Sequence, residues 1–78
     1  MNTIRIDVDR FIAREQIMPQ DDQYGYWTFI IAGQSMSIFG TYSEATTVAK
    51  LYVRMYESDE NTIVLDSVAT AGQVYQAG

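Results

Sequence analysis

The fold of this chain is decided by the stretch YGYWTFIIAGQSMSIFGT, which covers residues 24–41. Aromatic and β-branched residues are frequent on both sides of Gly33-Gln34, as is typical of β-strands. A glycine at the first central position of a two-residue loop suits a type II′ turn. The stretch therefore predicts a β-hairpin with strands over residues 24–32 and 35–41.

The expected register of this hairpin divides its side chains between two faces. It pairs Ile31 with Met36, Phe29 with Ile38 and Trp27 with Gly40. Side chains alternate across a strand, so one face should be the buried core: Trp27, Phe29, Ile31, Met36 and Ile38. The opposite face holds more apolar groups than an ordinary solvent face: Tyr26, Thr28, Ile30, Ser35, Ser37 and Phe39.

A helix and another strand should follow the hairpin. Ser43 is a good helix N-cap, and Glu44 lies in the first turn, where the helix dipole stabilises a negative charge. Apolar residues then recur at spacings of three and four, which predicts a helix that ends near Ser58: Ala45, Val48, Ala49, Tyr52 and Tyr56. Residues 62–68 are rich in Ile, Val and Leu and predict a strand.

The N-terminal segment allows two interpretations. Residues 3–9 alternate between apolar and charged side chains, which predicts a half-buried strand. The alternation slips after Asp9-Arg10. One interpretation is a single long strand with a bulge at that point, and the other is a short helix capped by Asp9 and ended before Pro19. The strand is favoured over residues 10–17, because Phe11, Ile12 and Ile17 form a poor helical stripe.

Together these elements predict a single α+β domain over residues 1–78. Its mostly antiparallel sheet would have four strands in the element order β-β-β-α-β, with one amphipathic helix packed on one face. Residues 69–78 would form either a frayed tail or a short fifth strand at the edge.

Composition excludes several classes of function. The chain has no Cys and no His, so it has neither a thiolate nor the usual general base near neutral pH. The carboxylate groups have simple structural explanations. Those of Asp7 and Asp9 fit the solvated side of a strand, those of Asp21 and Asp22 fit a turn, and those of residues 57–60 fit a solvated helix end. We therefore expect no enzyme activity, no metal site and no cofactor. Apolar runs are too short to cross a bilayer, which predicts a soluble cytoplasmic protein with no membrane contact.

Charge is distributed unevenly along the chain. The net charge is −5, and residues 15–49 contain no Lys or Arg although they hold six of the ten aromatic residues. A surface that binds phosphates needs cations, so direct binding of nucleic acid is not expected here.

One sequence pattern resembles a known family. Residues 26–29 and 38–42, followed by Ser43-Glu44-Ala45 at the start of a helix, resemble the three-strand-plus-helix domains of plant ethylene-response factors and phage integrase arm-binding regions. The resemblance covers about residues 24–56 and implies a small DNA-binding or regulatory domain as an alternative function. Those families read DNA with Arg and Lys on the strands. This hairpin has neither residue, so no DNA contact carries over to it.

Protein binding fits the sequence best. Tyr, Trp, Met and Phe are enriched at the centres of interfaces. The aromatic residues that the core cannot accommodate should therefore form a partner surface with acids around it: Asp21, Asp22, Tyr24, Tyr26, Phe39, Glu57, Asp59 and Glu60. Such a surface would suit a protein with a basic surface.

In general character the chain is similar to small, acidic, phage-encoded anti-defence proteins. That resemblance implies an inhibitor of a host nucleic-acid-handling complex of the CRISPR or restriction type, such as an anti-CRISPR protein. Self-association remains open beside a foreign partner, either as a homodimer through the same sheet face or as a homo-oligomeric accessory or structural subunit.

Overall fold

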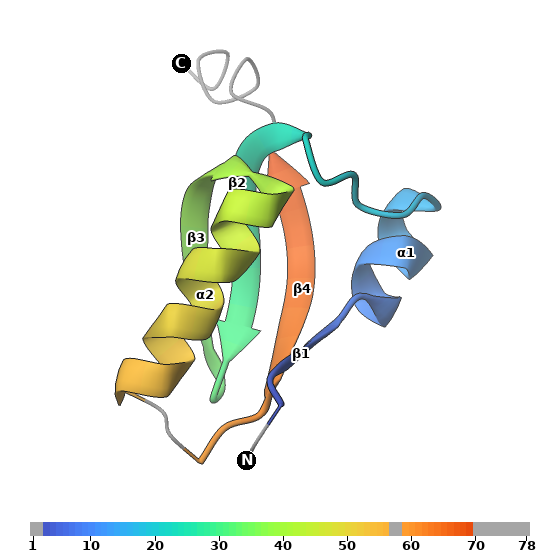
Figure 1. Cartoon of the computed structure of the whole chain (residues 1–78). Helices are drawn as coiled ribbons and strands as arrows, with labels where there is room; N and C mark the ends of the chain where they lie inside the picture. Colours follow the sequence, from blue (N-terminus) through green and yellow to red (C-terminus); the bar gives the residue numbers. More distant parts are fainter. Residues whose placement is uncertain (1–2, 57–58, 70–78) are drawn as a thin grey trace, which may run out of the picture.

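The computed structural model describes residues 3–56 and 59–69. Its elements are β1 (Arg5–Asp7), α1 (Asp9–Glu15), β2 (Tyr24–Ile31), β3 (Gln34–Thr41), α2 (Tyr42–Tyr56) and β4 (Thr62–Ala69). The strands form one sheet in the order β1-β4-β2-β3, with β1 parallel to β4 and the other neighbours antiparallel (Figure 1). This confirms the predicted α+β class and the mostly antiparallel sheet of four strands. Residues 70–78 of the predicted tail lie outside the described residues.

The prediction of a single long N-terminal strand is wrong. Strand β1 ends at Asp7, and α1 follows directly, so the element order is β-α-β-β-α-β. The slip in alternation marks a change from strand to helix rather than a bulge. Helix α1 is short and docks through Phe11, whose ring is fully buried and lies 5.9 Å from that of Trp27. A single large buried residue holds this helix, and a continuous apolar stripe is not needed.

The ends of α1 also differ from those expected for a helix at this place. Its N-cap is Val8, with no side-chain capping bond, and the Asp7 carboxylate instead accepts the backbone N–H of Asp9 at 3.0 Å. At the other end Gln16 adopts a left-handed conformation with φ of 60°, and its N–H donates to the carbonyl oxygen of Ile12. The helix thus ends before Pro19, as the alternative interpretation predicted.

The hairpin turn lies one residue earlier than expected. Ile31 pairs with Gln34, so the two loop residues are Ala32 and Gly33. Both have positive φ, 51° and 82°, which is the pattern of a type I′ turn rather than type II′. The predicted pairs, such as Ile31 with Met36, are therefore wrong by two residues. A shift of two leaves every side chain on the same face, so the predicted core face is confirmed.

The left-handed conformation of Ala32 provides a stability prediction. An L-residue with a Cβ pays roughly 1 kcal/mol or more in this region, and Asn tolerates it better. We expect Ala32→Asn to raise the free energy of unfolding by up to about 1 kcal/mol. Urea denaturation would measure the change, with Ala32→Ser as the matched polar control. An Asn variant no more stable than the Ser variant would contradict this account of the turn.

Helix α2 begins with a reciprocal cap that differs from the predicted one. The helix starts at Tyr42, so Ser43 is not its N-cap. The Glu44 carboxylate accepts the N–H of Thr41 at 3.0 Å, and the Thr41 hydroxyl oxygen accepts the N–H of Glu44 at 3.2 Å. This is a capping box, in which Thr and Glu stand three residues apart. It joins the end of β3 rigidly to the start of α2.

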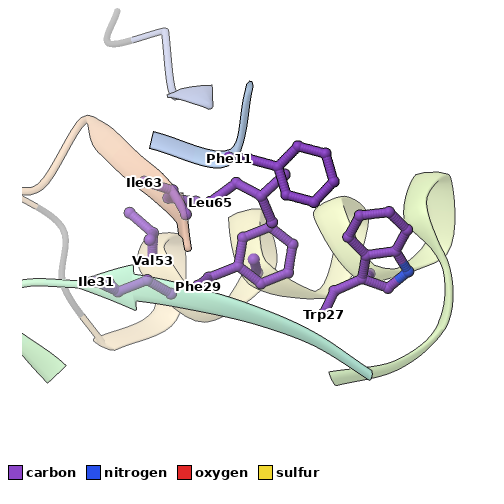
Figure 2. Close-up of a cluster of buried hydrophobic side chains, with 9 residues drawn as sticks. Phe11, Trp27, Phe29, Ile31, Val53, Ile63 and Leu65 are labelled. Carbon is purple, nitrogen blue, oxygen red and sulfur yellow. The ribbon is translucent and has the colours of Figure 1, made fainter. Parts of the chain in front are cut away.

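Both helices pack on the same face of the sheet. Buried side chains of α1 and α2 meet those of β2 and β4 in one cluster (Figure 2): Phe11, Trp27, Phe29, Ile31, Ala45, Ala49, Val53, Ile63 and Leu65. We call the opposite side of the sheet the outer face. No element of residues 3–56 or 59–69 covers it.

Strand β4 carries a bulge that controls where two cations lie. Thr28 pairs with Ser67, but the next residue of β2 pairs with Leu65, which leaves Asp66 as the extra residue. Its carboxylate accepts a hydrogen bond from Arg10 at 3.0 Å and lies 3.8 Å from the guanidinium of Arg14. The bulge therefore turns Asp66 towards α1, and both arginines stay on the helical side of the molecule.

Candidate protein-binding surface

Three aromatic side chains gather at one end of the outer face, and we call them the aromatic cluster: Tyr24, Tyr26 and Phe39. Tyr26 lies directly opposite Phe39 across the β2–β3 pair, and their ring centroids are 4.8 Å apart. The ring of Tyr24 lies 5.9 Å from that of Phe39. Tyr24 is 59% exposed, Tyr26 37% and Phe39 54%. These three predicted contact residues therefore form one solvent-facing group.

The strand alternation explains why the cluster is exposed. Trp27 and Phe29 use the core face of β2, and Gly25 leaves room there for the end of β4. A Cβ at Gly25 would lie 2.8 Å from the carbonyl oxygen of Ala69. The core face is therefore filled at this end of the sheet, and the neighbouring Tyr24 and Tyr26 must point to the outer face.

The predicted acids of the first turn lie at the same end of the sheet as the cluster. Asp21 and Asp22 are exposed, and only Gln23 separates them from the start of β2. The turn is tied to the start of α2, because the carbonyl oxygens of Asp21 and Gln23 accept the N–H groups of Ser43 and Tyr42, both at 3.1 Å. The two carboxylates are therefore held at the same end of the sheet as the aromatic cluster.

The predicted acids that follow α2 do not join this surface. Glu57 lies outside the described residues. Asp59 and Glu60 precede the start of β4, whereas the end of β4 pairs with Tyr26, so they lie roughly 25 Å along the sheet from the cluster. Glu60 has a local structural role, because its carboxylate accepts the N–H of Asn61 at 3.2 Å.

Cations are absent from the aromatic end of the outer face. Arg10 and Arg14 bind Asp66 on the helical side, and Lys50 and Arg54 belong to α2, which packs on that same side. Arg5 pairs with Thr62 in the first register position of β1, at the opposite end of the sheet. These are all five Lys and Arg residues of the chain.

The outer face extends beyond the residues that sequence reasoning selected. Ile30 pairs with Val64, and Thr28 pairs with Ser67, which continues the face across β4. The hydroxyl oxygens of Thr28 and Ser37 lie 3.0 Å apart and link β2 to β3. Simple alternation would put Val64 and Ser67 on opposite faces, so the bulge at Asp66 hides this part of the surface from the sequence pattern. No sequence signal shows that β4 inserts beside β2.

Tyr42 lies beneath this end of the sheet, on the core side, with its ring 4.8 Å from that of Trp27. Burial, and next the nearby Asp21 carboxylate, raises the pKa of the Tyr42 phenol above its ordinary value of 10.0. The folded state therefore keeps this proton at a pH where the unfolded chain loses it. The associated stability is fully present below about pH 10 and is lost as the pH rises through the folded-state pKa.

This shift predicts a pH-dependent difference between two variants. We expect the free energy of unfolding of Tyr42→Phe to fall less than that of the unmodified chain between pH 8 and about pH 10.5. Urea denaturation at both pH values measures it, with Tyr56→Phe on the same helix as the control. Equal losses for Tyr42→Phe and the unmodified chain would contradict the assignment.

The described residues contain no group of three or more acids placed to hold a metal ion. Within the same residues, no helix is both long enough and apolar enough to span a membrane. Comparisons with protein-family models, with curated proteins and with solved structures find no match.

Proposed function

We propose that this chain is a non-enzymatic protein-binding domain that contacts its partner through the aromatic end of the outer face. The exposed aromatic cluster carries the proposal. Three neighbouring aromatic rings at 37–59% exposure would leave water on binding, and they contribute nothing to the buried core. Aromatic residues of this kind dominate the centres of protein interfaces, with polar residues at the rim.

The charges around the cluster indicate the chemistry of the partner. Asp21 and Asp22 lie in the turn at the same end of the sheet as the cluster, and every cation lies on the helical side or at the far end of the sheet. A complementary partner presents a basic surface with an apolar centre. Basic surfaces are common on proteins that bind nucleic acids. The specific form of the proposal is therefore a small phage-type inhibitor of a host nucleic-acid-handling complex, acting in the host cytoplasm.

The alternative DNA-binding function finds less support. A sheet that binds duplex DNA needs cations on the face that meets the phosphates. The aromatic end of the outer face has no Lys or Arg, and Arg5 lies at the opposite end of the sheet. The favoured contact is therefore with a protein that itself carries positive charge.

An affinity experiment with matched variants tests the proposal. The unmodified chain would be immobilised and exposed to lysates of bacterial hosts, and bound proteins identified by mass spectrometry. We expect a basic, nucleic-acid-binding protein whose retention decreases at high salt, because acid–base contacts are screened. Tyr24→Thr/Tyr26→Thr should lose this protein, since Thr keeps a strand-forming residue but removes both rings.

The control removes two exposed apolar groups elsewhere on the surface. Ile17→Thr/Tyr56→Thr changes one loop residue and one α2 residue, at 54% and 65% exposure, and should retain the partner. Circular dichroism would show that both double variants are folded. The proposal fails if the two variants retain the same proteins, or if the retained proteins are acidic.

A further inference from the structure

The free edge of the sheet at β3 lacks the features that usually prevent pairing with another strand. The strand order places β3 at one end, and no described residue pairs with its outer side. Its eight residues contain no charge and no proline, and its register with β2 runs without a bulge. Charges, prolines, bulges and short length are the usual ways in which proteins protect an edge.

The opposite edge shows the usual protection. Strand β1 has three residues, and two of them, Arg5 and Asp7, are charged. A short, charged edge is a poor template for another strand. The sheet therefore has one protected edge, at β1, and one open edge, at β3. Only the β3 edge lacks charges, a proline and a bulge.

Some backbone N–H and C=O groups of β3 point away from β2 and are free to pair with another strand. In a two-residue hairpin the closing pair, here Ile31 and Gln34, exchanges both hydrogen bonds, and bonded and non-bonded pairs then alternate. The N–H and C=O groups of Ser35, Ser37 and Phe39 therefore point away from β2. Beyond them, the N–H of Thr41 already donates to Glu44. Three consecutive outward positions are open.

An apolar flank of α2 lies along the same edge. Val48, Leu51 and Met55 are exposed and share one side of the helix, about 100° or more around the axis from the centre of the buried residues. Helix α2 lies in front of β2 and β3 in Figure 1 and runs from upper right to lower left across β3, with β4 on its right. The right-handed turn of the helix then places this flank on the side of α2 that faces away from β4, which is the side of the β3 edge.

We propose that the open edge of β3 and the apolar flank of α2 bind a second copy of this chain. The two β3 strands would pair antiparallel about a two-fold axis at Ser37. Ser35 then lies opposite the partner's Phe39, and Met36 lies opposite the partner's Ile38. All these side chains are uncharged, so the net charge of −5 on each copy brings no like charges together in this strand pair. The result is a continuous sheet of eight strands.

A second copy fits both parts of the surface. An extended peptide would satisfy the open backbone groups of β3 but would leave the flank of α2 exposed. Two-fold symmetry presents each β3 edge together with its own α2 flank, so strand meets strand and helix meets helix. The dimer also leaves both aromatic clusters on the outer face, and it does not depend on what they bind.

Sedimentation equilibrium tests the dimer with matched variants. We expect the unmodified chain to have twice the mass of a single chain at micromolar concentrations. Val48→Glu should weaken the dimer by at least tenfold, because it places a carboxylate on the apolar flank. Thr47→Glu adds the same charge at the neighbouring exposed position, outside the flank, and should leave the dimer unchanged. Ser37→Pro removes an outward N–H group and should also dissociate the dimer.

Amide hydrogen exchange provides a measurement that needs no variant. The amides of Ser35, Ser37 and Phe39 should become protected as the chain concentration rises, whereas the turn amide of Gly33 should not change. The proposal is overturned by a monomer at hundreds of micromolar, or by a dimer that Val48→Glu and Ser37→Pro leave intact. It is equally overturned if Tyr24→Thr/Tyr26→Thr abolishes the dimer, because association would then use the outer face.

Discussion

Replacing Trp27 by alanine is expected to lower the free energy of unfolding by about 3–5 kcal/mol, one of the two largest effects proposed for this domain. Trp27 is fully buried, and its ring lies against those of Phe11 and Tyr42. It therefore joins α1, the sheet and the start of α2. A domain of this length has a total stability on the order of 4–12 kcal/mol, so the variant should be largely unfolded or close to it.

The indole nitrogen adds a polar contribution that a second variant isolates. Nε1–H of Trp27 donates to the carbonyl oxygens of Gln23 at 3.2 Å and Gly40 at 3.1 Å. Trp27→Phe keeps an aromatic ring but leaves these acceptors without their donor, at an expected cost of about 1–3 kcal/mol. Urea denaturation followed by far-UV circular dichroism measures both variants. Trp27→Ala with the stability of the unmodified chain would contradict the described core.

Replacing Phe11 by alanine is expected to cost about 3–5 kcal/mol as well. Phe11 is the buried residue of α1 and contacts the core beside Trp27. The substitution removes the main hydrophobic contact between α1 and the sheet. The ion pairs of Arg10 and Arg14 with Asp66 are too exposed to compensate for it.

A control just beyond the end of α1 separates the loss of a buried apolar side chain from the loss of an exposed one. Ile17→Ala removes an apolar side chain that is mostly exposed, and should change the free energy of unfolding by less than about 0.5 kcal/mol. Hydrogen exchange should show that Phe11→Ala opens α1 more than it opens the β2–β3 hairpin. Equal costs for the two variants would show that α1 does not dock through Phe11.

The hairpin and α2 were predictable because each has a local pattern. The alternation of Trp27 and Phe29 assigns the core face correctly even though the turn is misplaced, since a shift of two residues preserves the face. Helix α2 has regular apolar spacing, and even its true cap is visible in the Thr41–Glu44 spacing. Local hydrogen-bonding chemistry and periodicity were sufficient for these elements.

The features that the sequence did not predict correctly depend on tertiary contacts. Helix α1 has one buried residue, Phe11, so its pattern is too weak to distinguish it from a continued strand. The insertion of β4 between β1 and β2 has no local signature. For the same reason Asp59 and Glu60 could not be separated from the aromatic cluster before the register of β4 was known.

Photocrosslinking tests the central claim most directly, namely that the aromatic end of the outer face contacts a protein partner. A benzophenone amino acid would replace Tyr24 in one sample and Tyr56 in another, two tyrosines of similar exposure on opposite sides of the sheet. Irradiation in a host lysate should produce a covalent adduct with a basic protein from position 24 and none from position 56. Adducts from position 56 alone, or the same adducts from both positions, would contradict the account.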